Sequence, residues 1–223
     1  VTTTAFPCAT LLACTWNTGI VREIGAAGAR EVHENGVGVW LTPAINIHRT
    51  PLCGRNFEYY SEDPLVAGEM AAAMVEGIQS EGVGASLKHF ACNNKETNRK
   101  DSDSRVSERA LREIYLKGFE ICVKKAQPLT VMSSYNLLNG LWASQNRELL
   151  TDILRGEWGF EGMVTTDWYT HAPQYTEIAA GNDVKMGCGD PAHTLKMMRE
   201  GKLSREDVKT SVKRLLEMIL KLP

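Results

Sequence analysis

One carboxylate stands at the end of an apolar run, where it can meet a ligand. The segment Gly162–Trp168 is rich in apolar and β-branched residues and places Asp167 directly before Trp168. Ligands of parallel α/β proteins bind beyond the carboxyl ends of the strands, so an Asp at such an end, beside an aromatic ring, can face a ligand. Asp also favours the N-cap of a helix. The segment alone therefore leaves two interpretations open, a functional carboxylate and a helix cap.

A second apolar run ends in two polar side chains, Lys88 and His89. Alternation along a strand sends neighbouring side chains to opposite faces, although at the rim of a barrel the second can turn toward the pocket. A Lys-His pair taken alone is more often solvated than functional. We interpret this pair as functional because another strand end supplies the carboxylate of Asp167.

The segment Leu52–Pro64 combines a glycine, an arginine, several carboxylates and two tyrosines in one long loop. Such a mixture suits the recognition of a polyol, because it offers bidentate donors, acceptors and flat faces for C–H groups. Arg55 and Glu58 are the main candidates in this loop. The alternative is that these two side chains form a structural clamp within a rigid loop.

Five short apolar or β-branched runs alternate with longer segments of helical spacing. We expect strands at residues 36–46, 82–90, 129–135, 162–168 and 183–186, and helices at residues 18–35, 64–80, 107–125, 146–158 and 204–220. Asp63 followed by Pro64, and Ser204 followed three residues later by Asp207, are typical of helix starts. This alternation predicts parallel strands covered by helices, which is an α/β fold.

Polar side chains follow four of these runs, and parallel strands end on one side of a sheet, so we expect the side chains to meet at one rim. A closed barrel gathers strand ends better than an open sheet does. The sequence therefore favours a (β/α)8 TIM-type barrel over an open sheet. Only about five strand–helix units are visible, whereas a complete barrel typically needs ~250 residues. We expect residues 1–223 to form a single partial barrel domain that lacks the first strand region.

The composition excludes several classes of function. The 223 residues carry 27 acidic and 25 basic side chains, for a net charge of −2, and 43% of them are apolar. No basic excess is available for nucleic-acid phosphates, and no apolar run approaches the ~18 residues of a membrane span. The histidines lack metal-ligand spacing, and no phosphate-binding glycine loop or Gly-x-Ser-x-Gly elbow occurs. We therefore expect neither a metal nor another cofactor, and no nucleic-acid or membrane partner.

Six cysteines are spread thinly along the chain, and none belongs to a Cys-x-x-Cys pair. This usage predicts mostly buried, reduced thiols rather than a disulfide scaffold. No Asn-x-Ser/Thr sequon occurs either. Together the two observations favour a cytoplasmic location.

The rim motifs, taken in order, resemble those of glycoside hydrolase family 3, in its β-glucosidase branch. The resemblance rests on Pro43–Glu58 followed by Ser61–Pro64, on Lys88–Phe90 with Asn93 and Asn94, on Val131–Asn136 with Asn139 and Gly140, and on Thr151–Trp168. It covers almost the whole chain, from Phe6 and Pro7 to the segment Gly201–Leu203.

This resemblance implies the N-terminal catalytic barrel domain of a retaining, exo-acting β-glycosidase, which hydrolyses the non-reducing terminal β-D-glucosyl residue of a glucoside or oligosaccharide. Asp167 would be the nucleophile that forms a glycosyl-enzyme intermediate. Nearby Arg55 and Lys88 charges would favour the ionised form of this carboxylate. Six residues would bind the substrate: Arg55, Lys88 and His89 at the sugar hydroxyls, and Met132, Tyr135 and Trp168 along the pocket.

One departure from the family pattern bears on activity. A retaining mechanism needs a second carboxyl group, roughly 5–5.5 Å from the first, that acts as acid and then as base. In the β-glucosidases of this family that Glu generally comes from a second α/β domain, and neither Glu58, Asp63 nor Glu96 matches its position. The resemblance therefore implies a weakly active chain unless a second domain or a partner chain supplies the acid/base. The alternatives are a truncated, non-catalytic carbohydrate-binding fragment and an enzyme of the same family for xylose or arabinose, such as a β-xylosidase.

Overall fold

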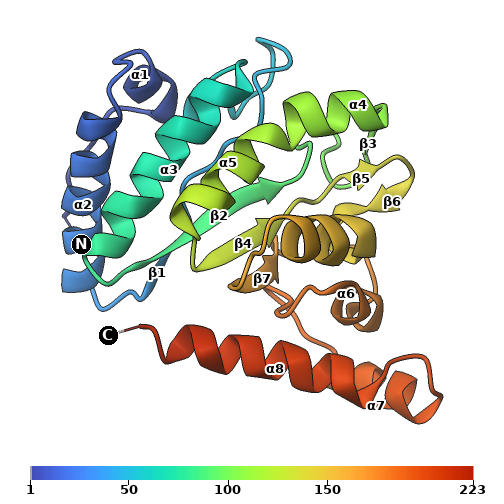
Figure 1. The fold of residues 1–223 in the computed structure, drawn as a ribbon. Coiled ribbons are helices and arrows are strands. Elements are labelled where there is room, and N and C mark those ends of the chain that lie inside the picture. Colours follow the sequence, from blue (N-terminus) through green and yellow to red (C-terminus); the bar gives the residue numbers. More distant parts are fainter. Residues whose placement is uncertain (1, 223) are drawn as a thin grey trace.

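A four-stranded parallel sheet forms the centre of residues 2–222, the part of the chain that this computed structural model describes (Figure 1). Its strands, in spatial order, are β1 (Val39–Trp40), β2 (Gly84–Phe90), β4 (Thr130–Ser133) and β7 (Met163–Thr166). Every residue of β4 and β7 is buried, as in parallel sheets that are covered on both faces. β1 and β7 are the two edge strands of this sheet and do not pair with each other, so the expected barrel is not closed within the described residues.

Helices connect successive strands, as the alternation in the sequence predicts. They are α2 (Thr18–Glu34) before β1, α3 (Pro64–Ser80) before β2, α5 (Lys117–Ala126) before β4, and η4 (Glu148–Glu157), which has π-helical hydrogen bonds, before β7. The expected start of α3 is confirmed, because the Asp63 side chain accepts the N–H groups of Leu65 and Val66. α2, α3 and α5 pack side by side over the sheet (Figure 1).

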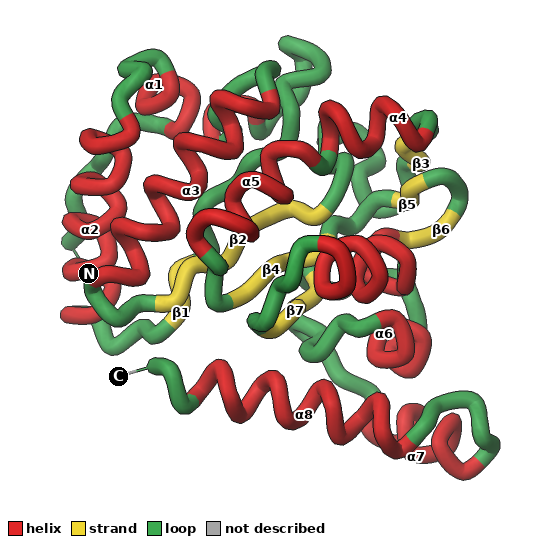
Figure 2. The backbone as a smooth tube through the Cα atoms, viewed as in Figure 1, coloured by secondary structure: helices red, strands yellow, loops and turns green. Residues whose placement is uncertain are grey.

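Shorter elements and the C-terminal helices complete the fold. They are α1 (Ala9–Ala13), η1 (Asn56–Glu58), β3 (Asp103–Ser104), α4 (Glu108–Ala110), η2 (Leu111–Tyr115), β5 (Leu137–Leu138), β6 (Leu141–Trp142), η3 (Ala143–Gln145), α6 (Gln174–Ala180), α7 (Pro191–Arg199) and α8 (Arg205–Ile219). The hairpin of β5 and β6 turns at Asn139 and Gly140, which both have positive φ, as a type I′ turn requires. α8 begins at its expected cap, Ser204, and packs against α6 and β7, away from α2 and α3 (Figure 2).

The first expected strand is much shorter than residues 36–46, since only β1 pairs regularly. Beyond β1 the chain still runs beside β2, because Ser86 N–H donates to the Thr42 carbonyl and Lys88 N–H donates to the Pro43 carbonyl, each at 3.0 Å. Pro43 itself has no N–H to donate, so the regular ladder is interrupted there.

The last expected strand, at residues 183–186, is reduced to a single parallel bridge between Thr165 and Val184. Two residues further on, the backbone N–H of Met186 donates to a side-chain oxygen, Thr166 Oγ1, at 2.9 Å, and not to a backbone carbonyl of β7. The segment 183–186 therefore lies beside β7 but is too irregular to count as a strand.

All six cysteines are free thiols, and their burial differs from the expectation. Half of them are buried (Cys53, Cys92 and Cys122) and half are exposed (Cys8, Cys14 and Cys188). The prediction of mostly buried thiols is thus wrong for the three that lie in terminal and loop segments. None of the helices between residues 2 and 222 combines the length and the apolar character that a membrane-spanning helix needs.

Glycines set the close approach of α2 to α3. A Cβ atom at Gly77 of α3 would overlap the backbone carbonyl of Arg22 in α2. A Cβ atom at Gly25 of α2 would lie 2.7 Å from the backbone oxygen of Met74 in α3. Because backbone atoms cannot move aside as flexible side chains do, any larger residue at Gly77 must push the two helices apart.

We therefore expect Gly77→Ala to lower the free energy of unfolding by about 1–3 kcal/mol through overpacking. Gly156→Ala is the control, because Gly156 is an exposed helical glycine of η4 whose added Cβ would meet only Thr151 O at 3.6 Å. That change should leave stability within about 1 kcal/mol of the wild type, on the stabilising side. Urea unfolding of the three proteins measures the difference, and equal midpoints for both variants would show that α2 and α3 are not held this closely.

Candidate active site

Asp167 lies at the carboxyl end of β7, where the sequence pattern places it. Its N–H donates to the carbonyl of Ser133 in β4 at 3.2 Å, so the hydrogen bonding of the sheet extends to this residue. The residue is 5% exposed. Residues 168–173 form turns and bends, and α6 begins only at Gln174, after Pro173. The interpretation of Asp167 as a helix cap is therefore wrong.

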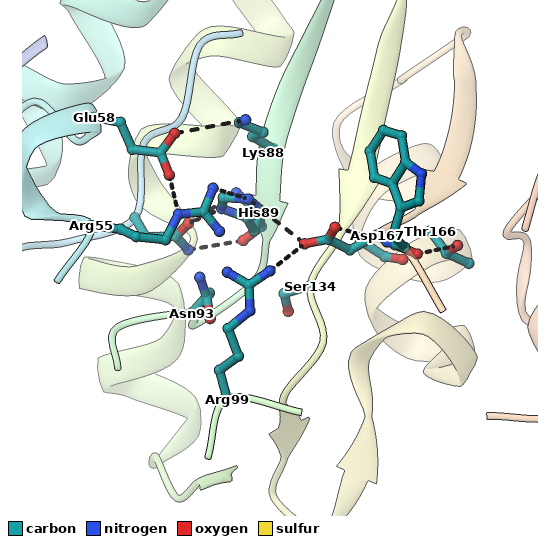
Figure 3. A network of polar contacts seen from close by, with 12 residues as sticks. Arg55, Glu58, Lys88, His89, Asn93, Arg99, Ser134, Thr166 and Asp167 are labelled. Atoms are coloured by element: carbon teal, nitrogen blue, oxygen red, sulfur yellow. Dashed lines mark hydrogen bonds and ion pairs between the residues drawn. The ribbon is translucent and has the colours of Figure 1, made fainter. Parts of the chain in front are cut away.

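The two oxygens of the Asp167 carboxylate have different surroundings (Figure 3). Oδ1 accepts the backbone N–H of Trp168 at 2.8 Å. Oδ2 is buried and accepts no hydrogen bond from the residues that the structure describes. Its nearest cationic or potentially cationic atoms are Arg99 Nη2 at 3.5 Å and His89 Nε2 at 3.8 Å. The chain thus fixes one oxygen through its own backbone and leaves the other free.

Arg55 and Lys88 share a carboxylate other than Asp167. Glu58, at the end of η1, forms an ion pair with Arg55 Nε through Oε1, and its Oε2 lies 3.7 Å from Lys88 Nζ. The structural clamp considered for this loop is therefore present. The same guanidinium also reaches the site, because Arg55 Nη2 donates to His89 Nε2 at 3.1 Å. Burial lowers the pKa of Lys88, and the negative charge of Glu58 opposes that shift.

Arg99 is the cation that the sequence analysis missed. Its Nη2 faces Asp167 Oδ2, its Nη1 pairs with Glu96 Oε2 at 2.8 Å, and its guanidinium carbon lies 4.4 Å from the centre of the Tyr135 ring. The expectation that Arg55 and Lys88 supply the nearby positive charge is corrected, since among the basic side chains of residues 2–222 only those of Arg99 and His89 come within 4.0 Å of the Asp167 carboxylate. A sequence signal existed: Glu96 and Arg99 follow the end of β2 at a spacing that suits an ion pair.

An irregularity in β2 turns Lys88 and His89 toward the same region (Figure 3). The register between β2 and β4 shifts between Leu87 and Phe90, and such a bulge breaks the alternation of side chains. Asn46 then fixes the backbone of His89 on both sides: its Oδ1 accepts the His89 N–H at 2.9 Å, and its Nδ2 donates to the His89 carbonyl at 2.8 Å.

His89 is a neutral ring. Burial, followed by the positive charges of Arg55, Lys88 and Arg99, holds the pKa of this histidine well below its usual value. The Nε2 atom accepts from Arg55, which never loses its proton, so the ring proton lies on Nδ1. Nδ1 is 3.4 Å from Asn46 Oδ1, the acceptor on that side. A ring in this state neither pairs with Asp167 as a cation nor donates to it from Nε2.

The three expected lining residues lie at the carboxyl ends of their strands. Met132 is almost fully buried and alternates along β4 with Val131, which belongs to the helix-covered core. Tyr135 is buried, and burial together with the Asp167 charge raises the pKa of its phenol, which therefore keeps its proton. Trp168 is partly exposed and packs where Gly187 leaves room, since a Cβ there would lie 3.0 Å from Trp168 Cδ1.

The arrangement can bind a hydroxylated ligand and offer it a nucleophilic oxygen. His89, near the end of β2, and Arg99, which follows that strand, lie beside Oδ2 of Asp167, and this oxygen is ready to form a bond because no donor among residues 2–222 occupies it. Within residues 2–222, no group of three or more His, Cys, Asp or Glu side chains is placed to hold a metal ion.

The protonation of His89 makes stability depend on pH with a definite sign. The unfolded chain binds a proton at this residue below about pH 6.5 and the folded chain does not, so stability falls as pH decreases. We expect the wild type to lose up to ~1.4 kcal/mol more per pH unit than His89→Gln between about pH 6.5 and about pH 5. Urea unfolding at several pH values measures both slopes, and the four other histidines are common to both proteins. Parallel slopes would mean that His89 is not held neutral.

Comparison with known proteins identifies the family of this chain. The model of the family described as glycosyl hydrolase family 3 N terminal domain matches residues 1–218. Beta-glucosidase A of Butyrivibrio fibrisolvens is 60% identical over 208 residues, which make up 93% of this chain and 25% of that protein. The exo-alpha-(1->6)-L-arabinopyranosidase of Bifidobacterium breve is 45% identical over 222 residues, 98% of this chain and 29% of that protein.

A solved structure of similar sequence has the same fold. Beta-glucosidase 3B from Thermotoga neapolitana, in complex with alpha-D-glucose, superposes with a TM-score of 0.96 and is 52% identical; the match covers 99% of this chain and 32% of that one. This chain therefore spans about a quarter to a third of the length of these relatives. It belongs to glycoside hydrolase family 3, and over nearly its whole length it is close to the N-terminal domain of the family's beta-glucosidases.

Proposed function

We propose that this chain provides the nucleophile and most of the sugar-binding side chains of a retaining, exo-acting β-glucosidase. Oδ2 of Asp167 attacks the anomeric carbon of a non-reducing terminal β-D-glucosyl residue, and the bond from that carbon to the leaving oxygen breaks with its electron pair. The product of this step is a glycosyl-enzyme ester on Asp167. Water then attacks the same carbon and releases glucose with retained configuration.

The observation that supports this proposal most strongly is the free Oδ2 of Asp167. It is buried, accepts no hydrogen bond from residues 2–222 and lies 3.5 Å from Arg99 Nη2. A carboxylate oxygen that no donor occupies keeps its lone pairs available for attack on carbon. The Trp168 N–H on Oδ1 fixes the direction in which Oδ2 points.

The remaining site residues have roles that follow from their positions. Arg55, Lys88 and His89 come from two elements that face the carboxylate from one side (Figure 3), and they hold the sugar hydroxyls. Met132, Tyr135 and Trp168 line the pocket around the sugar ring. As positive charge develops on the sugar ring in the transition state, hydrogen bonds to its hydroxyls strengthen. This strengthening would lower the activation barrier of glycosyl transfer.

The proton donor for the leaving oxygen comes from outside residues 1–223. The two carboxylates nearest to the site on this chain are each paired with cations, Glu58 with Arg55 and Lys88, and Glu96 with Arg99. Neither presents a free acid to a leaving group. A second domain or a partner chain supplies this group, which agrees with the fraction of its relatives that the chain spans.

The same proposal describes the fold as a single partial (β/α) barrel domain. The four parallel strands end in β1 and β7, to which further strands can add, and the carboxyl ends of β2, β4 and β7 contribute site residues to one side of the sheet. The similarity to the family's N-terminal domain supports this barrel assignment.

A second sugar specificity within the same mechanism has one observation in its favour. A relative that is 45% identical over 98% of this chain is an exo-alpha-(1->6)-L-arabinopyranosidase. Initial rates on the dinitrophenyl β-glucoside, β-xyloside and α-L-arabinopyranoside separate these specificities. A non-catalytic, carbohydrate-binding role is the third outcome, and it requires binding of glucose without turnover of any of them.

Covalent labelling tests the nucleophile directly. We expect 2,4-dinitrophenyl 2-deoxy-2-fluoro-β-glucoside to add one fluoroglucosyl group to the peptide that contains Asp167, because its leaving group departs without protonation. Asp167→Asn should abolish the label while glucose binding, measured by calorimetry, is retained. Mass spectrometry of the digested protein locates the group. A label on any other residue would contradict the assignment.

The missing acid/base predicts how the chain treats different substrates. We expect hydrolysis of the dinitrophenyl glucoside to exceed that of cellobiose by at least about a hundredfold, since only the latter needs a proton on its leaving oxygen. Sodium azide should accelerate turnover of the aryl glucoside and yield β-glucosyl azide, because azide attacks the glycosyl-enzyme without a general base. Cellobiose hydrolysis as fast as that of the aryl glucoside would mean that an acid is present in this chain.

A further inference from the structure

Two buried ion pairs arise from the segment 183–186, and the mechanism proposed above uses neither. The segment lies beside β7: Asp183 N–H donates to the Val164 carbonyl at 2.7 Å, and Thr166 N–H donates to the Val184 carbonyl at 2.9 Å. The side chains of Asp183 and Lys185 are 0% and 9% exposed. Because Asp183 and Lys185 are two residues apart in a segment that runs beside β7, their charges lie at different positions along this strand.

The Asp183 carboxylate holds helices against the beginning of β7. Its Oδ2 accepts from Arg155 Nη2 at 2.9 Å and from the Val164 N–H at 2.8 Å. Its Oδ1 accepts from Arg214 Nη1 at 3.1 Å. Arg155 belongs to η4 and Arg214 to α8, so this group joins two helices to the strand.

The Lys185 ammonium holds the loop that follows Asp167. Nζ donates to Thr170 Oγ1 at 2.9 Å, to the carbonyls of Thr170 and Ala172 at 3.1 and 2.8 Å, and to Glu177 Oε2 at 2.9 Å. The other Glu177 oxygen accepts from Thr170 Oγ1 at 2.7 Å. A single buried cation thus fixes three points between residues 170 and 177.

This loop is the element that orients the Asp167 carboxylate. The Trp168 N–H donates to Oδ1, and the next residue is tied to the segment 183–186, since Tyr169 N–H donates to the Met186 carbonyl at 3.1 Å. A shift of the loop would move the Trp168 N–H and turn the carboxylate with it. The free oxygen would then no longer point into the site.

We propose that Lys185, through its ion pair with Glu177 and its bonds to Thr170 and Ala172, is a positioning residue for the Asp167 nucleophile. The pair acts through the loop and does not touch the carboxylate. It keeps the Trp168 N–H on Oδ1 and so leaves Oδ2 directed at the substrate. This inference rests on the proposed role of Asp167, and the experiment below separates the two.

Lys185→Met is the test variant, and Arg155→Met is its matched control. Both cations are nearly buried, with 9% and 10% of the side chain exposed, and each pairs with a carboxylate at 2.9 Å, Lys185 with Glu177 and Arg155 with Asp183. Both changes remove a buried cation and should destabilise the protein. Only the first loosens the loop after Asp167.

The rate and the affinity of labelling by the dinitrophenyl fluoroglucoside distinguish positioning from loss of stability. For Lys185→Met we expect kinact to fall about tenfold to a hundredfold while KI changes less than about threefold, as for a misplaced reacting group. For Arg155→Met we expect kinact within about twofold of the wild type. Lys185→Arg, which keeps the charge, should recover part of the rate. Equal kinact values for Lys185→Met and Arg155→Met would overturn the inference.

Hydrogen exchange tests the loop without any activity. We expect faster exchange in a peptide spanning residues 167–173 for Lys185→Met, and in one spanning residues 148–158 for Arg155→Met. If Lys185→Met does not fold, Thr170→Val removes only the hydroxyl between the two charges and should show the same pattern more weakly. Unchanged exchange over residues 167–173 in Lys185→Met would overturn the inference. If the fluoroglucoside does not label the wild type but exchange changes as expected, the proposed function is contradicted and Lys185 is still the residue that holds the loop.

Discussion

The site depends on a buried carboxylate oxygen, Oδ2 of Asp167, that accepts no hydrogen bond from the described part of the chain. Burying such a charge costs several kcal/mol unless other charges offset it. Arg99 offsets it here from 3.5 Å, close enough for attraction but too far for a strong hydrogen bond. His89 lies almost as close to Oδ2, and its neutrality prevents it from closing the oxygen off as an ion pair.

Burial is the main cause of that neutrality, and two residues outside the immediate contacts of Asp167 add to it. Arg55 donates to His89 Nε2, and the charges of Arg55 and Lys88 oppose a further positive charge on the ring. Glu58 holds both of these cations in place. The loop of η1 and the end of β2 therefore act on the carboxylate indirectly, while β7 and the segment 183–186 position its backbone. Two groups of residues, one on each side, thus determine the position and the surroundings of the Asp167 carboxylate.

The sequence predicted those features that local physics decides. The observed bounds of helices α2 and α3 lie within one residue of the predicted bounds. Capping residues mark the first turn of both helices, and a proline marks that of α3. Asp167 was found because a buried strand followed by a carboxylate is a local pattern. Its neighbour His89 was found in the same way, but Arg99 was not, because Arg99 lies in a loop whose path is decided by tertiary contacts, including its ion pair with Glu96 and its stacking on Tyr135. Lys185 was missed for the same reason, since nothing near it in sequence shows that Glu177 and Thr170 surround it.

The pairing of charges around Asp167 also bears on the sugar specificity proposed above. Three cations (Arg55, Lys88 and Arg99) and three carboxylates (Glu58, Glu96 and Asp167) meet there, so these six groups sum to zero. A uronic acid or a sugar phosphate would bring an anion to a place where each cation already faces a carboxylate. An uncharged pyranose brings no anion and therefore needs no unpaired cation. Under the proposed function, these paired charges would favour uncharged sugars over acidic ones before any contact with a particular hydroxyl is made.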